Sequence, residues 1–177
     1  RLLPFVASYQ DLFWVLTDEQ QRQVLAQPPG AFDGDRAVWA LVRTELYHLR
    51  GDAGRARRYA DTARMEFEFQ LRTAPQDGER RVLHGVALAY LGRAAEAERE
   101  GLRGIVLTPI DRDGYQGPYV QLQLTRIYLL IGDKAKALDQ LEPLLRIPYY
   151  LSAGWLRLDP TFAPLRGEPR FRRLVGE

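Results

Sequence analysis

The chain has 177 residues and a net charge of only +2, with 46% apolar and 27% charged residues. This composition is typical of a globular protein with an ample core, and it excludes the disordered and fibrous classes. The absence of cysteine excludes disulfides and zinc–thiolate sites, and no apolar run reaches the roughly 20 residues of a membrane helix. Because the sequence starts at Arg1 without a methionine or a leader, we expect it to be a fragment or processed form of a longer protein.

Arginine supplies almost all of the positive charge, since Lys134 and Lys136 are the only lysines among 25 basic residues. Arginines cluster at 55–58 and at 166–173. Basic clusters can indicate nucleic-acid binding, but acidic residues are interleaved with these arginines and no DNA-binding or RNA-binding motif accompanies them. We therefore interpret both clusters as solvated helix faces and expect no nucleic-acid partner.

A first helix pair is predicted at residues 3–27. Apolar residues between Phe5 and Leu16, including Tyr9, recur at helical spacing and predict one buried stripe. The run Thr17-Asp18-Glu19-Gln20 has the pattern of a capping box, in which the threonine and glutamine side chains bond each other's backbone N–H groups. The return helix is therefore expected to begin directly after Thr17.

A second helix pair is predicted at residues 35–74. Asp35 is the expected cap of its first helix, and Gly51-Asp52 forms the bend. Apolar residues stay on one face of the return helix as far as Leu71, so this helix is expected to exceed an ordinary repeat by about two turns.

Two further pairs are predicted at residues 78–108 and 118–146, joined by a loop rich in aspartate and glycine. In the third pair, Gly85 and Ala97 belong to faces of small residues that let the two helices approach closely. Gly92 marks the bend, and Pro109 ends the pair.

The spacing of Gly85, Gly92, Ala97 and Pro109 resembles a tetratricopeptide (TPR) repeat, a pair of antiparallel helices with small residues at their contact. The pattern recurs along the chain. The bend glycines Gly51, Gly92 and Gly132 are 41 and 40 residues apart, and the alanines 56, 97 and 137 keep the same two intervals. This interval exceeds the usual length of about 34 residues, and the extra residues fall in the long helix and the loop.

The last segment, residues 147–177, breaks the repeat pattern. Asp159-Pro160 and Glu168-Pro169 can each begin a short helix, and apolar residues including Trp155 and Leu158 are available to cover the open end of the last pair. Together with YLGR, GPYVQLQLTRIY and LDPTFAPLRGEPRF, this tail resembles the C-terminal repeat region of bacterial membrane-anchored serine/threonine protein kinases and related multidomain regulators.

The sequence therefore predicts an all-α fold. The resemblance implies one domain, residues 1–177, in which four antiparallel helix pairs stack as a right-handed TPR-like superhelix with a C-terminal cap. In TPR domains the first helices of the pairs line a concave groove. Carried over to this sequence, the groove residues are Leu41, Glu45, His48, Glu79, Val82, Val86, Tyr90, Tyr119, Leu122, Arg126 and Leu129. For Val82, Val86 and Leu122, plain core packing is an equal alternative.

No phosphate-binding loop, kinase motif or pair of metal-binding histidines occurs in the sequence, so we expect neither an enzyme nor a cofactor or metal site. We expect the groove to bind a protein or peptide segment. Arg126 would pair with a carboxylate and Glu45 or Glu79 with a cation. Two alternatives stay open, a self-association module and a small-molecule sensor with a pocket. The sequence indicates neither the partner nor the compartment in which the protein works.

Overall fold

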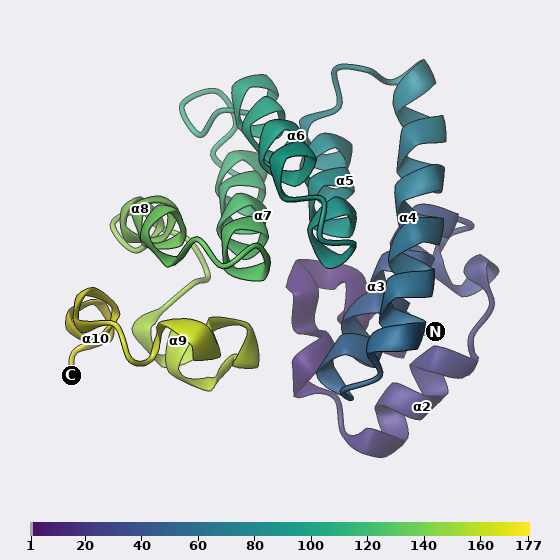
Figure 1. Cartoon of the computed structure of the whole chain (residues 1–177), viewed down its shortest axis with the longest axis horizontal. Helices are drawn as coiled ribbons and strands as arrows, with labels where there is room; N and C mark the ends of the chain where they lie inside the picture. Colours follow the sequence, from purple (N-terminus) through teal and green to yellow (C-terminus); the bar gives the residue numbers. More distant parts are fainter. Residues whose placement is uncertain (1) are drawn as a thin grey trace. The chain divides into compact units, whose positions relative to one another are not determined.

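The structure is a computed structural model that describes residues 2–177, and every regular element in this range is a helix (Figure 1). The predicted all-α class is confirmed. The chain forms two compact units, residues 1–75 and 76–177, and most residue contacts lie within one unit or the other. The division falls between the second and third predicted pairs. That all pairs form one domain stays a prediction.

Each unit is built of short helices that pack mainly on their neighbours in sequence. The first unit contains α1 (Leu2–Ser8), η1 (Tyr9–Val15), α2 (Asp18–Ala26), η2 (Pro29–Phe32), α3 (Arg36–Leu49) and α4 (Ala53–Thr73), where η marks a 3₁₀ helix. The second contains α5 (Gly78–Tyr90), α6 (Ala94–Leu107), α7 (Gln116–Leu130), α8 (Lys134–Leu144), α9 (Ala153–Leu158), η3 (Pro160–Leu165) and α10 (Pro169–Val175). Helix α3 packs on α4, α5 on α6, and α7 on α8, as predicted.

The three packed pairs share one bend of three residues with glycine in the middle. Gly51, Gly92 and Gly132 have φ angles of 74°, 78° and 85°, a left-handed conformation that glycine adopts without steric cost. The residue after each glycine donates its backbone N–H to the carbonyl five residues earlier, at 2.8, 3.0 and 2.9 Å respectively. This hydrogen bond defines a Schellman motif, so all three first helices end in the same way.

The helices of the α5/α6 pair approach closely because glycine and alanine line their contact. A Cβ atom built on Gly85 would lie 2.9 Å from the Ala97 carbonyl oxygen, and one built on Gly104 would lie 2.8 Å from the Gly78 carbonyl oxygen. Ala97 itself is fully buried. Both Gly85 and Ala97 are therefore contact residues, as their spacing predicts.

Several helices begin at a side-chain cap that the sequence indicates. The capping box is present, with Thr17 N 2.9 Å from Gln20 Oε1 and Gln20 N 3.3 Å from Thr17 Oγ1. Asp35 Oδ1 accepts two backbone N–H groups at the start of α3. Asp52 and Asp133, the last residues of their bends, likewise cap α4 and α8.

The predicted first helix differs from the structure, because residues 2–15 form an α-helix followed by a 3₁₀ helix. Helix α1 ends at Ser8, and Asp11 has φ = 58°, which an α-helix does not allow. The prediction of one continuous buried stripe is therefore wrong at two positions, Phe5 and Tyr9. Phe5 is 57% exposed and Tyr9 is 43% exposed, whereas Phe13 further along is buried.

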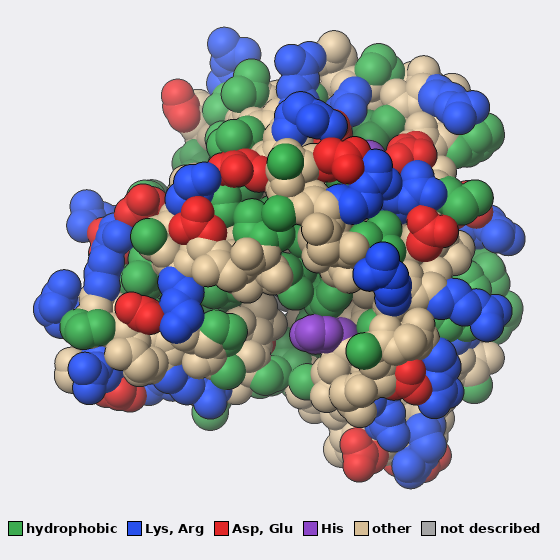
Figure 2. All heavy atoms as spheres, in the orientation of Figure 1, with side chains coloured by type: hydrophobic (Ala, Val, Ile, Leu, Met, Phe, Trp, Pro, Cys, Tyr) green, Lys and Arg blue, Asp and Glu red, His purple; other side chains and the backbone are tan. Residues whose placement is uncertain are grey.

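The tail from residue 147 onward packs on the last helix pair, with η3 against α7 and α10 against α8. Charged pairs accompany this packing, and acidic and basic side chains alternate over α8 and α10 in Figure 2. These pairs are Arg170 with Asp139 at 2.6 Å, Arg170 with Glu142 at 2.5 Å, and Lys134 with Glu168 at 2.9 Å.

The apolar side of the tail is largely as expected. Phe162, Leu165 and Phe171 are buried, and Asp159 caps η3 by accepting the Thr161 N–H at 2.8 Å. The prediction that Leu158 helps to cover the open end of the last pair is wrong, since its side chain is 71% exposed. Leu156, two positions earlier in α9, is completely buried in its place.

Candidate functional site

The predicted groove residues fall into both units. Leu41, Glu45 and His48 lie on α3 in the first unit, where Leu41 and Glu45 are buried and His48 is exposed. Val82 and Val86 on α5 and Leu122 on α7 are buried, which suits the core alternative for these three. The remaining residues also lie on α5 and α7 in the second unit, and are treated next.

Of the predicted groove residues, Glu79 on α5 lies near the start of α7, and Tyr119 belongs to the first turn of α7. Gln116 Nε2, one turn before Tyr119 on α7, donates to Glu79 Oε2 on α5 at 3.4 Å. Both Glu79 and Tyr119 are half-buried. Tyr90 is also half-buried, but it lies at the opposite end of α5. We call Glu79 and Tyr119 the α5/α7 face.

Arg126 and Leu129 lie deeper in the second unit, at 4% and 9% exposure. Arg126 Nη1 donates to the buried Gln123 Oε1 at 3.0 Å. Burial raises the pKa of Asp159 in the tail, and the positive charge of Arg126 acts in the opposite direction. Because α7 packs against η3, a partner's carboxylate would reach Arg126 only after this packing opens.

His84 belongs to a charged cluster between α5 and α6. Its Nδ1 atom lies 3.6 Å from Glu100 Oε2, which accepts a hydrogen bond from Arg81 Nη1 at 2.9 Å. The contact with His84, followed by Arg81, lowers the pKa of Glu100 from 4.5 to about 2. His84 is 7% exposed, so it is a histidine of the α5/α6 core.

This cluster predicts a specific dependence of stability on pH. Since the pKa of Glu100 is lower in the folded state, its ionised form stabilises the fold above about pH 4.5 and loses that effect as the pH falls toward about 2. Glu100→Gln should therefore lower the free energy of unfolding near neutral pH, measured by urea denaturation. The difference from the natural protein should shrink through the same pH window. A difference that stays constant with pH would contradict the electrostatic cause.

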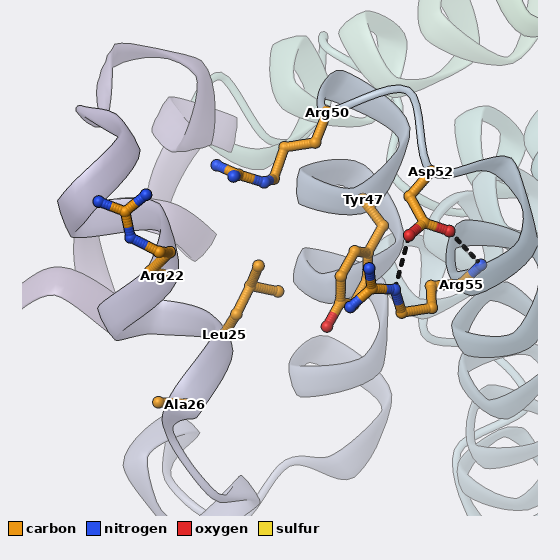
Figure 3. Close-up of a pocket in the computed structure, with 7 residues that line it drawn as sticks. All are labelled: Arg22, Leu25, Ala26, Tyr47, Arg50, Asp52 and Arg55. Carbon is orange, nitrogen blue, oxygen red and sulfur yellow. Dashed lines mark hydrogen bonds and ion pairs between the residues drawn. The ribbon is translucent and has the colours of Figure 1, made fainter.

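The first unit contains an open pocket of about 560 Å³ between α2 and the α3–α4 bend (Figure 3). Helix α2 provides one wall, and the end of α3 with the start of α4 provides the other. The lining residues are Arg22, Leu25, Ala26, Tyr47, Arg50, Asp52 and Arg55. In the view of Figure 3, the Arg50 side chain extends from the end of α3 toward α2, which carries Arg22. Three arginines around one hollow make it a candidate site for an anion.

Stacked aromatic and arginine side chains form the α3–α4 side of this pocket. The Tyr47 ring lies between the Tyr59 ring, at 5.5 Å between centroids, and the Arg55 guanidinium, at 4.7 Å. Arg43 continues the stack between Trp39 and Tyr59, at 4.5 and 5.1 Å. Arg55 is thus held in place by its aromatic neighbour.

This pocket was not predicted from the sequence, because Arg55 was interpreted as part of a solvated helix face. The sequence does contain a signal for this pocket. Arg50 and Arg55 flank the bend residues Gly51 and Asp52, and Tyr47 lies one turn before them. A bend of this geometry brings residues from the end of one helix and the start of the next to the same place.

No protein-family model, curated protein or solved structure matches this chain. Within residues 2–177, no group of histidine and acidic residues could hold a metal ion. In the same range, no helix combines the length and apolar character needed to cross a membrane.

Proposed function

We propose that this protein is a non-catalytic scaffold that binds a protein or peptide segment, as a regulatory module of a bacterial signalling protein. The proposal includes the stacking of its helix pairs into a TPR-like right-handed superhelix, whose first helices carry the binding residues. It follows the resemblance to TPR repeats.

The observation that carries the proposal is the repeated bend. Three helix pairs end their first helix with a glycine at positive φ and the same backbone hydrogen bond, so their geometry is repeated as well as their sequence spacing. Repeats of this kind hold side chains on rigid helices, which favours recognition of an extended or helical segment.

The α5/α7 face is the part of the predicted groove that best supports peptide contact. Tyr119 and Glu79 are half-buried, so their side chains are held in place and still reach the surface. A tyrosine provides a large contact area and loses little rotamer entropy on binding, while a carboxylate can pair with a basic residue of the peptide. We therefore expect a partly apolar segment with a basic residue near one aromatic or aliphatic anchor.

The test is to select displayed random peptides against the full chain and to measure their affinity by fluorescence anisotropy. Tyr119→Ala should weaken the selected peptides by about tenfold or more, as expected for an aromatic anchor. Glu79→Gln should weaken mainly those peptides that contain a basic residue.

The control is Leu102→Ala on α6, where the side chain is 45% exposed and lies outside the α5/α7 face. It should leave peptide affinity unchanged. If a folded Tyr119→Ala protein binds every selected peptide as the natural chain does, the peptide site lies elsewhere and the proposal fails for this face.

A further inference from the structure

We propose that the arginine pocket of the first unit binds a phosphate monoester that carries an apolar organic group. This site is separate from the α5/α7 face and goes beyond the peptide-binding function. It gives the small-molecule alternative from the sequence analysis a definite location and a definite ligand class.

Neighbouring side chains orient each arginine of the pocket. Arg22 Nη2 lies 2.8 Å from Glu19, and Arg50 Nη1 lies 3.1 Å from Gln21 and 3.5 Å from Asp18. Arg55 Nε lies 2.6 Å from Asp52, and Arg55 also bonds the Tyr47 side chain. A guanidinium has five N–H groups in a fixed fork, so a ligand can use further donors of Arg22 and Arg50. The stack on Tyr47 fixes Arg55 further. The pocket is thus organised before a ligand arrives, which lowers the entropy cost of binding.

The lining carries three arginines and one carboxylate, Asp52. Each arginine already has an acidic neighbour, which is Glu19 for Arg22, Asp18 for Arg50 and Asp52 for Arg55, so a dianion would bind by replacing these contacts. One arginine can satisfy a planar carboxylate by two parallel hydrogen bonds, whereas three arginines on two walls suit the three terminal oxygens of a phosphate ester. Because the side chains of Arg22 and Arg55 are 59% and 60% exposed, their present ion pairs contribute little free energy. A phosphoryl group can therefore compete for these arginines.

A second hollow, lined by four apolar residues and two glutamines, adjoins the charged one and indicates what the phosphate carries. This second hollow of about 410 Å³ is lined by Leu2, Leu3, Pro4, Gln23, Ala26 and Gln27, so Ala26 lines both hollows. Leu25 and Ala26 also give the charged pocket an apolar floor. Inorganic phosphate would leave this surface uncovered. An alkyl group on the phosphate would bury it.

The test is isothermal titration calorimetry on the full chain at low ionic strength, with hexyl phosphate, inorganic phosphate and hexanoate as probes. Hexyl phosphate should bind about tenfold more tightly than inorganic phosphate, because its methylene groups become buried. It should also bind more tightly than hexanoate, which has a single negative charge. Added salt should weaken all three, since the arginines are partly exposed.

Three substitutions separate the two parts of the site. Arg50→Gln should weaken both phosphate probes by about tenfold, because a charge-assisted hydrogen bond is lost. Leu2→Ser, at a side chain that is 72% exposed, should weaken hexyl phosphate and leave inorganic phosphate unchanged. Arg22→Gln repeats the charge test at a more exposed position, in case Arg50→Gln disturbs the fold.

The matched control is Arg72→Gln, which removes the same charge from an exposed arginine in the last turn of α4 outside the pocket. It should leave all three affinities unchanged. Equal weakening by Arg72→Gln and Arg50→Gln would show a diffuse electrostatic effect and overturn the site. Hexanoate binding as tightly as hexyl phosphate would overturn the phosphate assignment. Failure of peptide binding at the α5/α7 face would affect neither result.

Discussion

Replacing Phe162 by alanine is expected to destabilise the folded protein by about 3–5 kcal/mol, the usual cost of deleting a buried phenyl ring. Phe162 lies in η3, is 1% exposed, and belongs to the element that packs against α7. Its removal leaves a cavity between the tail and the last helix pair, which the surrounding helices can fill only in part. The measurement is urea denaturation followed by circular dichroism.

Leu158→Ala is the control for this experiment. It shortens an apolar side chain of the same tail, but one that is 71% exposed, so stability should change by less than about 0.5 kcal/mol. Equal stability of the Phe162→Ala and natural proteins would mean that the tail contributes nothing to the second unit, although its helices contact α7 and α8.

Replacing Gly104 by leucine is expected to cost about 3 kcal/mol, at the upper end of the range for overpacking. Even the first added carbon would lie 2.8 Å from the Gly78 carbonyl oxygen and 3.1 Å from Val82 Cβ. The first of these atoms is backbone, so a change of side-chain rotamer cannot relieve the clash. Helices α5 and α6 must move apart, and the melting temperature should fall.

Gly154→Ala is the matched control in the second unit. The nearest atom to a Cβ at Gly154 is Ser152 Oγ at 3.8 Å, an ordinary van der Waals distance. Because alanine also favours the helical conformation of α9, the melting temperature should stay the same or rise slightly. A Gly104→Leu protein that melts like this control would show that α5 and α6 do not approach as closely as described.

The sequence predicted the helix pairs well because their signals are local. A glycine in the bend, an aspartate after it and an alanine one turn later together indicate a helix end followed by a helix start, and they recur around Gly51 and Gly132. Around Gly92 the aspartate is replaced by Arg93, yet the backbone hydrogen bond is the same. The α-to-3₁₀ change near Asp11 was missed because Phe5, Tyr9 and Phe13 suit helical periodicity whether or not the backbone continues as an α-helix.

The candidate sites were harder to predict because they depend on contacts between residues far apart in sequence. Arg22 and Arg50 line one pocket although they belong to different helix pairs, and no spacing rule connects them. Arg126 was predicted by carrying over the groove positions of the TPR resemblance, which does not reveal that the tail packs against the same helix. The binding roles of the groove residues stay predictions.

The pattern of packing in the second unit also has a kinetic consequence. Helix α5 packs on α6, α6 on α7 and α7 on α8, so most contacts join segments that are close along the chain. Loop-closure entropy is small for such contacts, and proteins rich in them fold quickly. Two contacts span a longer stretch of the chain. Helix α5 packs on α7 across all of α6, and η3 packs on α7 across α8 and α9. We expect these two contacts to form after the pairs that are neighbours in sequence, so the tail should dock on α7 once the α7/α8 pair has formed.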